Sequence, residues 1–137
     1  MILSYHNNPA LKAKLLAEMK EHKKMDRIAK GGWFNDEEQK GCHIGCCGNV
    51  LGLPSGQPNF EEIAKKLGWP IWFAKLQEQI FEGLPQDEAA EFSIEIIEKT
   101  PVGVDLEKAL PLISIARMER LIELQKTPNT PLSLIHI

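Results

Sequence analysis

"NFEEIAKKLGWPIWFAKLQEQIFEGLPQDEAAEFSIEIIEKTP", residues 59–101, carries three successive helix signatures and decides the fold class. Asn59 is followed three positions later by Glu62, the spacing of a capping box, in which a polar side chain accepts a hydrogen bond from the first helical turn. Gly68 follows, and glycine readily takes the left-handed conformation that closes helices. The spacing therefore predicts a short helix between Asn59 and Gly68.

Two longer helices follow, and prolines and a glycine mark their ends. Pro70 and Pro85 each stand at the start of a helix, where the missing N–H group costs no hydrogen bond. Gly83 closes the first of these helices and Pro101 stops the second. Apolar residues at helical spacing predict the buried faces, which are Ile71, Trp72, Phe73, Leu76, Ile80 and Phe81 in the first helix and Ala89, Phe92, Ile96 and Ile97 in the second.

The N-terminal part of the chain predicts another long helix. Asn8 before Pro9 is a strong helix start, because the Asn side chain can accept from the first free N–H groups. We expect this helix to run from Pro9 to about Lys30, where two glycines end it. Its predicted core stripe is Leu11, Leu15, Met19 and His22, flanked by Leu16 and continued by Met25 and Ile28.

A last helix is predicted after Asp105, kinked or restarted at Pro111. Neither a period-two alternation nor a hairpin signal occurs in the sequence. We therefore expect an all-α fold, a compact irregular bundle of about five helices with a Gly/Cys-rich loop between helices one and two. Residues 1–127 are expected to form this single helical domain.

The last residues of the sequence are expected to be of non-native origin. LSLIHI, residues 132–137, is the translation of CTG-TCT-CTT-ATA-CAC-ATC, which looks like a transposon end used in sequencing-library adapters. We expect a truncated metagenomic sequence in which residues 128–137 are a non-native or disordered tail. His136 therefore receives no functional weight.

Composition indicates an ordinary globular protein. The 137 residues are 43% hydrophobic and 26% charged, and no run approaches the roughly 18 apolar residues that span a bilayer. The N-terminus shows no secretory signal, and three cysteines crowded together do not form a disulfide framework, so a cytoplasmic location is expected. The net charge of −3 gives no case for nucleic-acid binding. Nothing in the sequence decides whether a homo-oligomer forms.

Charge is distributed unevenly along the chain. Residues 9–30 carry seven Lys or Arg against three acids, whereas residues 85–107 carry seven acids against one Lys. The two segments could attract one another, or the basic helix could face an anionic ligand. The simplest interpretation is that both are solvated helix faces.

The segment "KGCHIGCCGN", residues 40–49, holds all three cysteines and three glycines, and it is called the Gly/Cys segment below. Cys42 and Cys46, with a histidine from His6, His22 or His43, could be considered as metal ligands. A zinc site usually shows two ligand pairs, so we expect no metal and no cofactor here. The ordinary structural interpretation is that the cysteines are buried as small apolar residues, that the glycines allow a crowded corner, and that His22 is a satisfied core histidine.

The leading functional hypothesis is recognition of a small anionic or nucleotide-like ligand. Consecutive glycines let backbone N–H groups converge on an anion, and the basic helix and nearby aromatic residues supply cations and stacking surfaces. Such a protein could sequester a small signalling molecule. The expected ligand-binding residues are Tyr5, His6, His22, Lys40, Gly41, Cys42, Gly45, Cys46 and Glu82.

Two other classes of function stay open. In a cysteine-dependent enzyme, Cys42 or Cys46 would be the nucleophile and His22 the base, with His6 or Glu82 orienting that base. A structural or protein-interaction module would have no pocket and would expose an apolar patch instead.

The order of these motifs resembles an uncharacterised family of small bacterial and phage proteins. The resemblance rests on "YH", "EH", "KGCHIGC" and "LGWPIWFAKLQEQIFEGLP", and it covers roughly residues 5–112. It implies a phage or prophage setting and no particular mechanism. It draws attention to Tyr5, His6, His22, Gly41, Cys42, Gly45, Cys46, Glu82 and Gly83, whereas His43 and Cys47 lie outside the family pattern.

Overall fold

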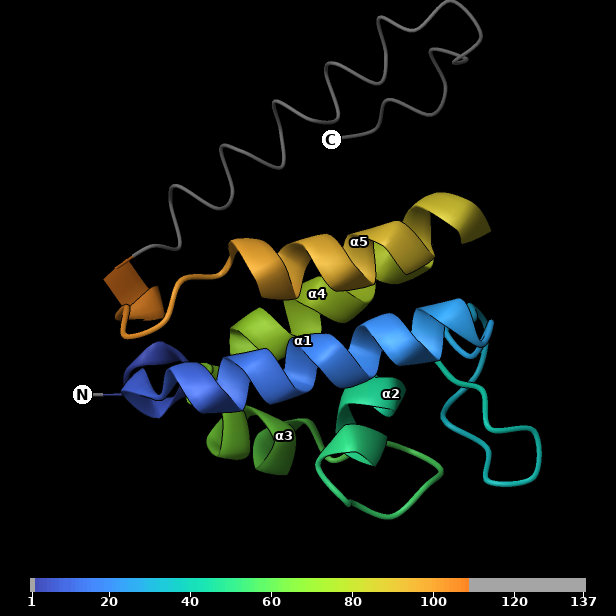
Figure 1. Cartoon of the computed structure of the whole chain (residues 1–137), viewed down its shortest axis with the longest axis horizontal. Helices are drawn as coiled ribbons and strands as arrows, with labels where there is room; N and C mark the ends of the chain where they lie inside the picture. Colours follow the sequence, from blue (N-terminus) through green and yellow to red (C-terminus); the bar gives the residue numbers. More distant parts are fainter. Residues whose placement is uncertain (1, 109–137) are drawn as a thin grey trace, which may run out of the picture. The chain divides into compact units, whose positions relative to one another are not determined.

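The computed structural model describes residues 2–108, and all of the named elements in this range are helical. The chain divides into two compact units, Met1–Asp105 and Leu106–Ile137, and the fold presented here is that of the first. Its elements in order are a short turn η1 (Ser4–Asn7) and the helices α1 (Pro9–Lys24), α2 (His43–Val50), α3 (Phe60–Leu67), α4 (Ile71–Gly83) and α5 (Gln86–Lys99) (Figure 1).

The predicted all-α bundle of about five helices is confirmed. Between residues 2 and 108 the only β-type pairings are isolated bridges, such as Ile28 with Gly41 and Phe34 with Gly56. The expected last helix beyond residue 108 and the expected tail at 128–137 lie outside the described residues.

The helix ends between α3 and α5 follow the local signals. The Asn59 side chain accepts from Glu62 N at 3.0 Å, and Gly68 closes α3 with a left-handed φ of 66°. Pro70 and Pro85 occupy the N-caps of α4 and α5. Asn8 likewise caps α1 by accepting from Ala10 N at 3.0 Å. These helix ends agree with the sequence because each cap depends on residues within one helical turn.

Helix α1 is shorter than predicted, since it ends at Lys24 and not near Lys30. Asp26 takes a left-handed φ of 58°. Arg27 N donates to His22 O at 2.8 Å and Asp26 N donates to Lys23 O at 3.0 Å, which is the bond pattern of a Schellman motif. The chain beyond this point leaves the helix and pairs with Gly41, whose N–H donates to Arg27 O at 2.9 Å. A tertiary contact therefore replaces the last helical turns.

Residues 43–50 of the Gly/Cys segment form the short helix α2, about two turns long, and the chain on both sides of it between α1 and α3 is irregular. The first turn of α2 finds two side-chain acceptors: Cys42 Sγ accepts from Gly45 N, and Glu78 Oε1 of α4 accepts from Ile44 N, both at 3.3 Å. Glycines allow close contact with the preceding segment, because an added Cβ at Gly41 would lie 2.4 Å from Phe34 Cα. Their role here is packing, as the ordinary structural interpretation expected.

The helices pack so that α1 lies between α5 and α2, while α4 contacts α2, α3 and α5 (Figure 1). The basic and acidic segments lie side by side as α1 and α5, which is the first of the arrangements considered from the sequence. Lys23 Nζ lies 3.1 Å from a Glu91 carboxylate oxygen. Lys12 Nζ donates to the carbonyl oxygens of Glu98 and Thr100 at 2.7 and 2.9 Å, so it caps the C-terminal end of α5.

Candidate functional site

The structure does not bring all of the residues predicted to bind a ligand to one place: Gly41, Cys42, Gly45 and Cys46 lie together, and His22 and Gly41 both lie beside Phe34. Tyr5 and His6 precede α1, whereas His22 is in its last turn. At 1.5 Å per residue, about 21 Å of chain separates Asn8 from His22. A small molecule therefore does not reach from the YH turn to His22.

His22 is a satisfied histidine at the C-terminal end of α1. Its Nδ1 lies 2.8 Å from Glu18 O, so this nitrogen donates, because a carbonyl oxygen only accepts. Its Nε2 then accepts from Asn49 Nδ2 at 3.1 Å. The ring packs against Phe34 with centroids 6.1 Å apart. Both nitrogens are occupied, so the structure does not favour His22 as a general base.

The YH motif forms an unusual left-handed turn. Tyr5, His6 and Asn7 have φ values of 52°, 52° and 54°. Three successive non-glycine residues in this region are strained, and strain of this kind persists only where surrounding contacts enforce it. Tyr5 is fully buried, and its hydroxyl donates to Ile97 O at 3.0 Å. An added Cβ at Gly68 would lie 2.3 Å from Leu3 O, so the end of α3 fits tightly under this turn.

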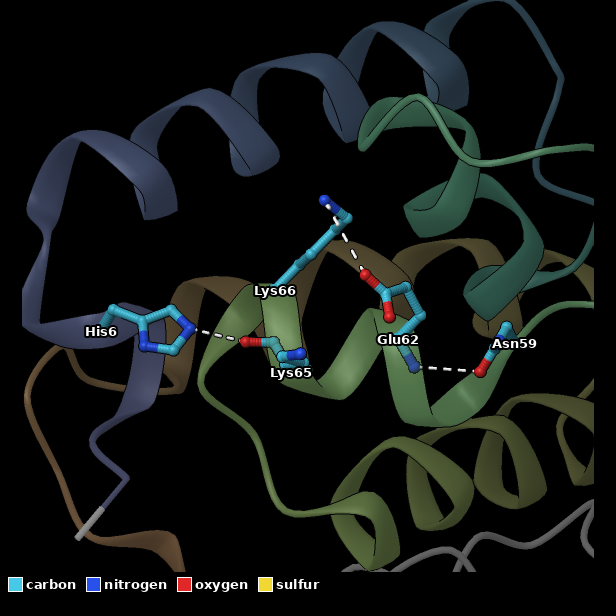
Figure 2. A network of polar contacts seen from close by, with 5 residues as sticks. All are labelled: His6, Asn59, Glu62, Lys65 and Lys66. Atoms are coloured by element: carbon cyan, nitrogen blue, oxygen red, sulfur yellow. Dashed lines mark hydrogen bonds and ion pairs between the residues drawn. The ribbon is translucent and has the colours of Figure 1, made fainter.

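Figure 2 shows where the His6 side chain points. Its Nε2 donates to Lys65 O in the last turn of α3 at 2.6 Å. The same helix is capped at its other end by Asn59, and Glu62 lies 4.0 Å from Lys66 as an i, i+4 pair. His6 thus supplies a donor to the C-terminal end of α3, which is a structural role remote from the cysteines.

All three cysteines are buried and carry free thiols. Cys46 Sγ donates to Gly41 O at 3.4 Å. Burial raises the pKa of the Cys46 thiol to about 12, and burial raises the thiol pKa values of Cys42 and Cys47 as well. A thiolate is the nucleophilic form, so these thiols are unreactive near neutral pH. Within residues 2–108, no group of three or more His, Cys, Asp or Glu side chains is arranged to hold a metal ion.

The remaining predicted residues do not form an anion cradle. The Gly41 N–H donates to Arg27 O at 2.9 Å, and the Gly45 N–H donates to Cys42 Sγ. These amides are occupied by protein acceptors. Lys40 is exposed and pairs through its backbone with Asn35, and the exposed Glu82 accepts from Gly31 N at 3.3 Å.

A different group of side chains meets between α2 and α4. We call Cys42, His43, Gln77 and Glu78 the α2–α4 polar cluster. His43 Nε2 lies 2.7 Å from Gln77 Oε1, and Glu78 Oε1 accepts from the backbone N–H next to His43. The residues His43, Gln77 and Glu78 are only 0%, 1% and 8% exposed. The ring of His43 lies beside two phenylalanine rings, Phe81 at 6.1 Å and Phe92 at 6.2 Å between centroids.

The α2–α4 polar cluster contains buried polar atoms without a hydrogen-bond partner. Within residues 2–108, these atoms are His43 Nδ1, Gln77 Nε2 and Glu78 Oε2. Each such atom costs about 1–3 kcal/mol, and native proteins leave few of them. Other buried atoms in the same state are found on Glu18, Trp69, Trp72 and Ser93. Three such atoms lie on neighbouring residues of α2 and α4, and they mark the α2–α4 polar cluster as the candidate functional site.

Burial also controls the charges in this cluster. It lowers the pKa of His43 to about 4, against the opposing effect of the Gln77 hydrogen bond, so the imidazole is neutral at pH 7. Burial raises the pKa of the Glu78 carboxyl, which the Cys42 thiol and the Ile44 N–H partly oppose. The cluster is therefore a neutral imidazole, an amide and a carboxyl group in a desolvated interior.

Sequence reasoning missed Gln77 and Glu78 as functional candidates, and it considered His43 only as a possible metal ligand. The predicted face of α4 contained Ile71 and Ile80, yet Ile71 is 42% exposed and the buried face is instead Phe73, Ala74, Gln77, Glu78 and Phe81. A signal was present, because Gln77 stands four residues from both Phe73 and Phe81 and so shares their face.

No protein-family model, curated protein or solved structure matches this chain. The resemblance to a phage family therefore stays a prediction. No helix within residues 2–108 is both long enough and apolar enough to cross a membrane.

Proposed function

We propose that this protein binds a small polar molecule in its interior between α2 and α4. The observation that carries the proposal is the set of three unpartnered polar atoms on His43, Gln77 and Glu78, all nine-tenths or more buried. A bound molecule would supply the missing hydrogen bonds and recover free energy that the unliganded chain lacks. The ligand hypothesis from the sequence is kept, but its site moves from the helix-one histidines to this cluster.

Binding is favoured over catalysis by the state of the nearby groups. The cysteine thiols are buried and protonated at neutral pH, and His22 has both ring nitrogens occupied. A cysteine enzyme needs a thiolate or an adjacent free base. A neutral imidazole and an amide are suited to recognition through directed hydrogen bonds.

Entry of a ligand requires movement of α2, which covers the cluster. This helix has only eight residues and includes two glycines, each of which costs about 1 kcal/mol relative to alanine. So short a helix is not stable alone and depends on its side-chain caps and tertiary packing. We expect local opening of α2 to be easier than global unfolding.

Native mass spectrometry tests the proposal, because it detects a bound molecule of any identity by its mass. The full chain is incubated with the small-molecule fraction of a bacterial extract, desalted and measured alongside Gln77→Met and Gln79→Met. Gln79 is an exposed residue on the same helix and serves as the matched control. We expect a mass adduct on the wild type and on Gln79→Met that is lost in Gln77→Met. A folded wild type without an adduct, or an adduct unaffected by Gln77→Met, would contradict the proposal.

A further inference from the structure

Helix α2 covers two titratable side chains of the α2–α4 polar cluster. His43, the first residue of α2, is 0% exposed, and Glu78 of α4 is 8% exposed. Within residues 2–108, neither side chain forms a hydrogen bond or an ion pair with a Lys or Arg side chain. Burial without a counter-charge disfavours the charged form of each group. In the closed position of α2, a neutral imidazole and a neutral carboxylic acid are therefore favoured.

Both side chains are held by contacts that break when α2 moves away from α4. Glu78 Oε1 accepts from Ile44 N, in the first turn of α2, at 3.3 Å. His43 Nε2 of α2 lies 2.7 Å from Gln77 Oε1 of α4. The remaining polar atoms, Glu78 Oε2 and His43 Nδ1, have no partner in the closed position. Opening of α2 admits water to both side chains, and hydration restores the ordinary ionisation of a histidine and a glutamic acid.

The other titratable groups of α2 and α4 do not oppose this expectation. On α2 they are the thiols of Cys42, Cys46 and Cys47, whose pKa values burial raises, so these thiols keep their protons below pH 8. On α4 the Glu82 carboxylate, one turn from Glu78, adds to the preference of Glu78 for its uncharged form. The closed position therefore contains no group that fixes a charge on Glu78.

The remaining elements around the cluster place uncharged side chains against it. The buried residues of α3 and α5 carry no charge, and they are Ile63, Ala64, Leu67, Ala89, Ser93, Ile94 and Ile97. The charged residues of these two helices are half-buried or exposed. From α1, His22 contacts Asn49 near the opposite end of α2, and Arg27, which follows α1, acts on the Cys46 thiol. His43 itself lies beside the rings of Phe81 and Phe92.

We propose that α2 is a proton-coupled lid over the α2–α4 polar cluster. The closed lid favours an uncharged His43 and an uncharged Glu78, whereas the open lid favours an imidazolium and a carboxylate. Opening therefore binds a proton at His43 and releases a proton from Glu78, both exchanged with water. Because the two exchanges have opposite signs, they partly cancel in the wild type. This inference adds the regulation of the proposed binding site, and it rests on that proposal only for the ligand.

Hydrogen–deuterium exchange of the α2 amides tests the lid, using the full chain without added molecules at pH 5 and pH 7.5. The opening constant of α2 is obtained after correction for the intrinsic exchange rate at each pH. In Glu78→Gln only the exchange at His43 remains. A hydrated histidine has a pKa of about 6.5 and burial lowers the pKa of His43 to about 4, so this opening constant should be at least about tenfold larger at pH 5. In His43→Leu only Glu78 remains, and the opening constant should instead increase with pH.

The wild type should change less with pH than Glu78→Gln, because its two proton exchanges oppose each other. Glu61→Gln removes an exposed carboxylate of α3 and is the control, which should behave as the wild type does. The comparison of the wild type with Glu78→Gln decides the matter even if His43→Leu does not fold.

Three results would overturn the lid. Equal pH dependence in the wild type and in Glu78→Gln would remove the role of Glu78, and an opening constant of Glu78→Gln that does not change with pH would remove the role of His43. Equal opening constants for α2 and α5 would mean that α2 opens only when the whole chain unfolds. Each of these results leaves the small-molecule proposal standing, since the mass adduct tests it separately.

Discussion

Replacing His43 and Gln77 together is expected to stabilise the folded chain, although each residue is nearly inaccessible to solvent. The pair shares one hydrogen bond of 2.7 Å and leaves His43 Nδ1 and Gln77 Nε2 unpartnered. At about 1–3 kcal/mol for each unpartnered atom, the variant His43→Leu/Gln77→Met removes about 2–6 kcal/mol of unfavourable free energy. It loses about 1 kcal/mol for the hydrogen bond and about 1 kcal/mol for repacking. The free energy of unfolding should therefore rise, by up to about 4 kcal/mol.

The single variants are expected to change stability in the opposite direction. His43→Leu leaves both polar atoms of the Gln77 amide unpartnered, and Gln77→Met leaves both ring nitrogens of His43 unpartnered. Each single change exchanges one unpartnered atom for another and loses the hydrogen bond, so each should cost about 1 kcal/mol. The coupling energy of the double-mutant cycle should then reach about 2 kcal/mol or more.

Urea unfolding followed by tryptophan fluorescence measures these differences, because Trp69 is only 2% exposed in the folded chain. The midpoint should move while the slope with denaturant stays constant. If the double variant is less stable than the wild type by the sum of the two single effects, the polar atoms are satisfied in the native protein. That result would refute the reasoning behind the candidate site.

Three further predictions concern the end of α1, the cysteine thiols and the ionisation of His43. Asp26→Gly should raise the free energy of unfolding by about 1 kcal/mol in a thermal or urea melt, because Asp26 adopts a left-handed φ of 58° that glycine takes without strain; no gain would contradict the Schellman geometry. Iodoacetamide at pH 7 should label the three buried thiols at least about tenfold more slowly in the folded chain than in urea. Rapid labelling of the folded chain would instead support the hypothesis of a reactive cysteine. Burial lowers the pKa of His43 to about 4 in the folded chain, whereas a histidine in the unfolded chain has a pKa of about 6.5. Between pH 6.5 and 4 only the unfolded chain therefore binds this proton. The free energy of unfolding should fall by about 3 kcal/mol as the pH decreases over this range. The free energy of unfolding of His43→Leu is measured over the same pH range and subtracted, so that the contribution of Glu78 cancels. If the free energy of unfolding depends on pH equally in the two proteins, the prediction for His43 is wrong.

The helix boundaries were predictable where the signal lay within one turn of the chain. Asn59 and Gly68 bound α3 as predicted, because a cap and a left-handed closing glycine need only local neighbours. The end of α1 was not predictable, since Asp26 closes it and the chain then pairs with Gly41, 15 positions further along. Long-range pairing of this kind leaves no periodic pattern in the sequence.

The candidate site was less predictable than the fold. The Gly/Cys segment attracted attention for its thiols, yet its functional candidate is the neighbouring His43. The partner residues Gln77 and Glu78 were not among those predicted for the apolar face of α4. They are buried because α4 contacts α2, α3 and α5, so the side of the helix that faces inward depends on three neighbours at once.

The amino-acid sequence by itself determined that the chain is helical, where three of its helices begin and end, and that a basic segment and an acidic segment could pair. These properties follow from caps, breakers and charge, which act over a few residues. Only the tertiary structure decided that the Gly/Cys segment forms α2, that His6 and His22 serve separate ends of the bundle, and that a histidine, a glutamine and a glutamate meet in the interior. These features depend on which segments pack against each other and on which polar atoms then find hydrogen-bond partners. Packing of this kind is a property of the whole fold.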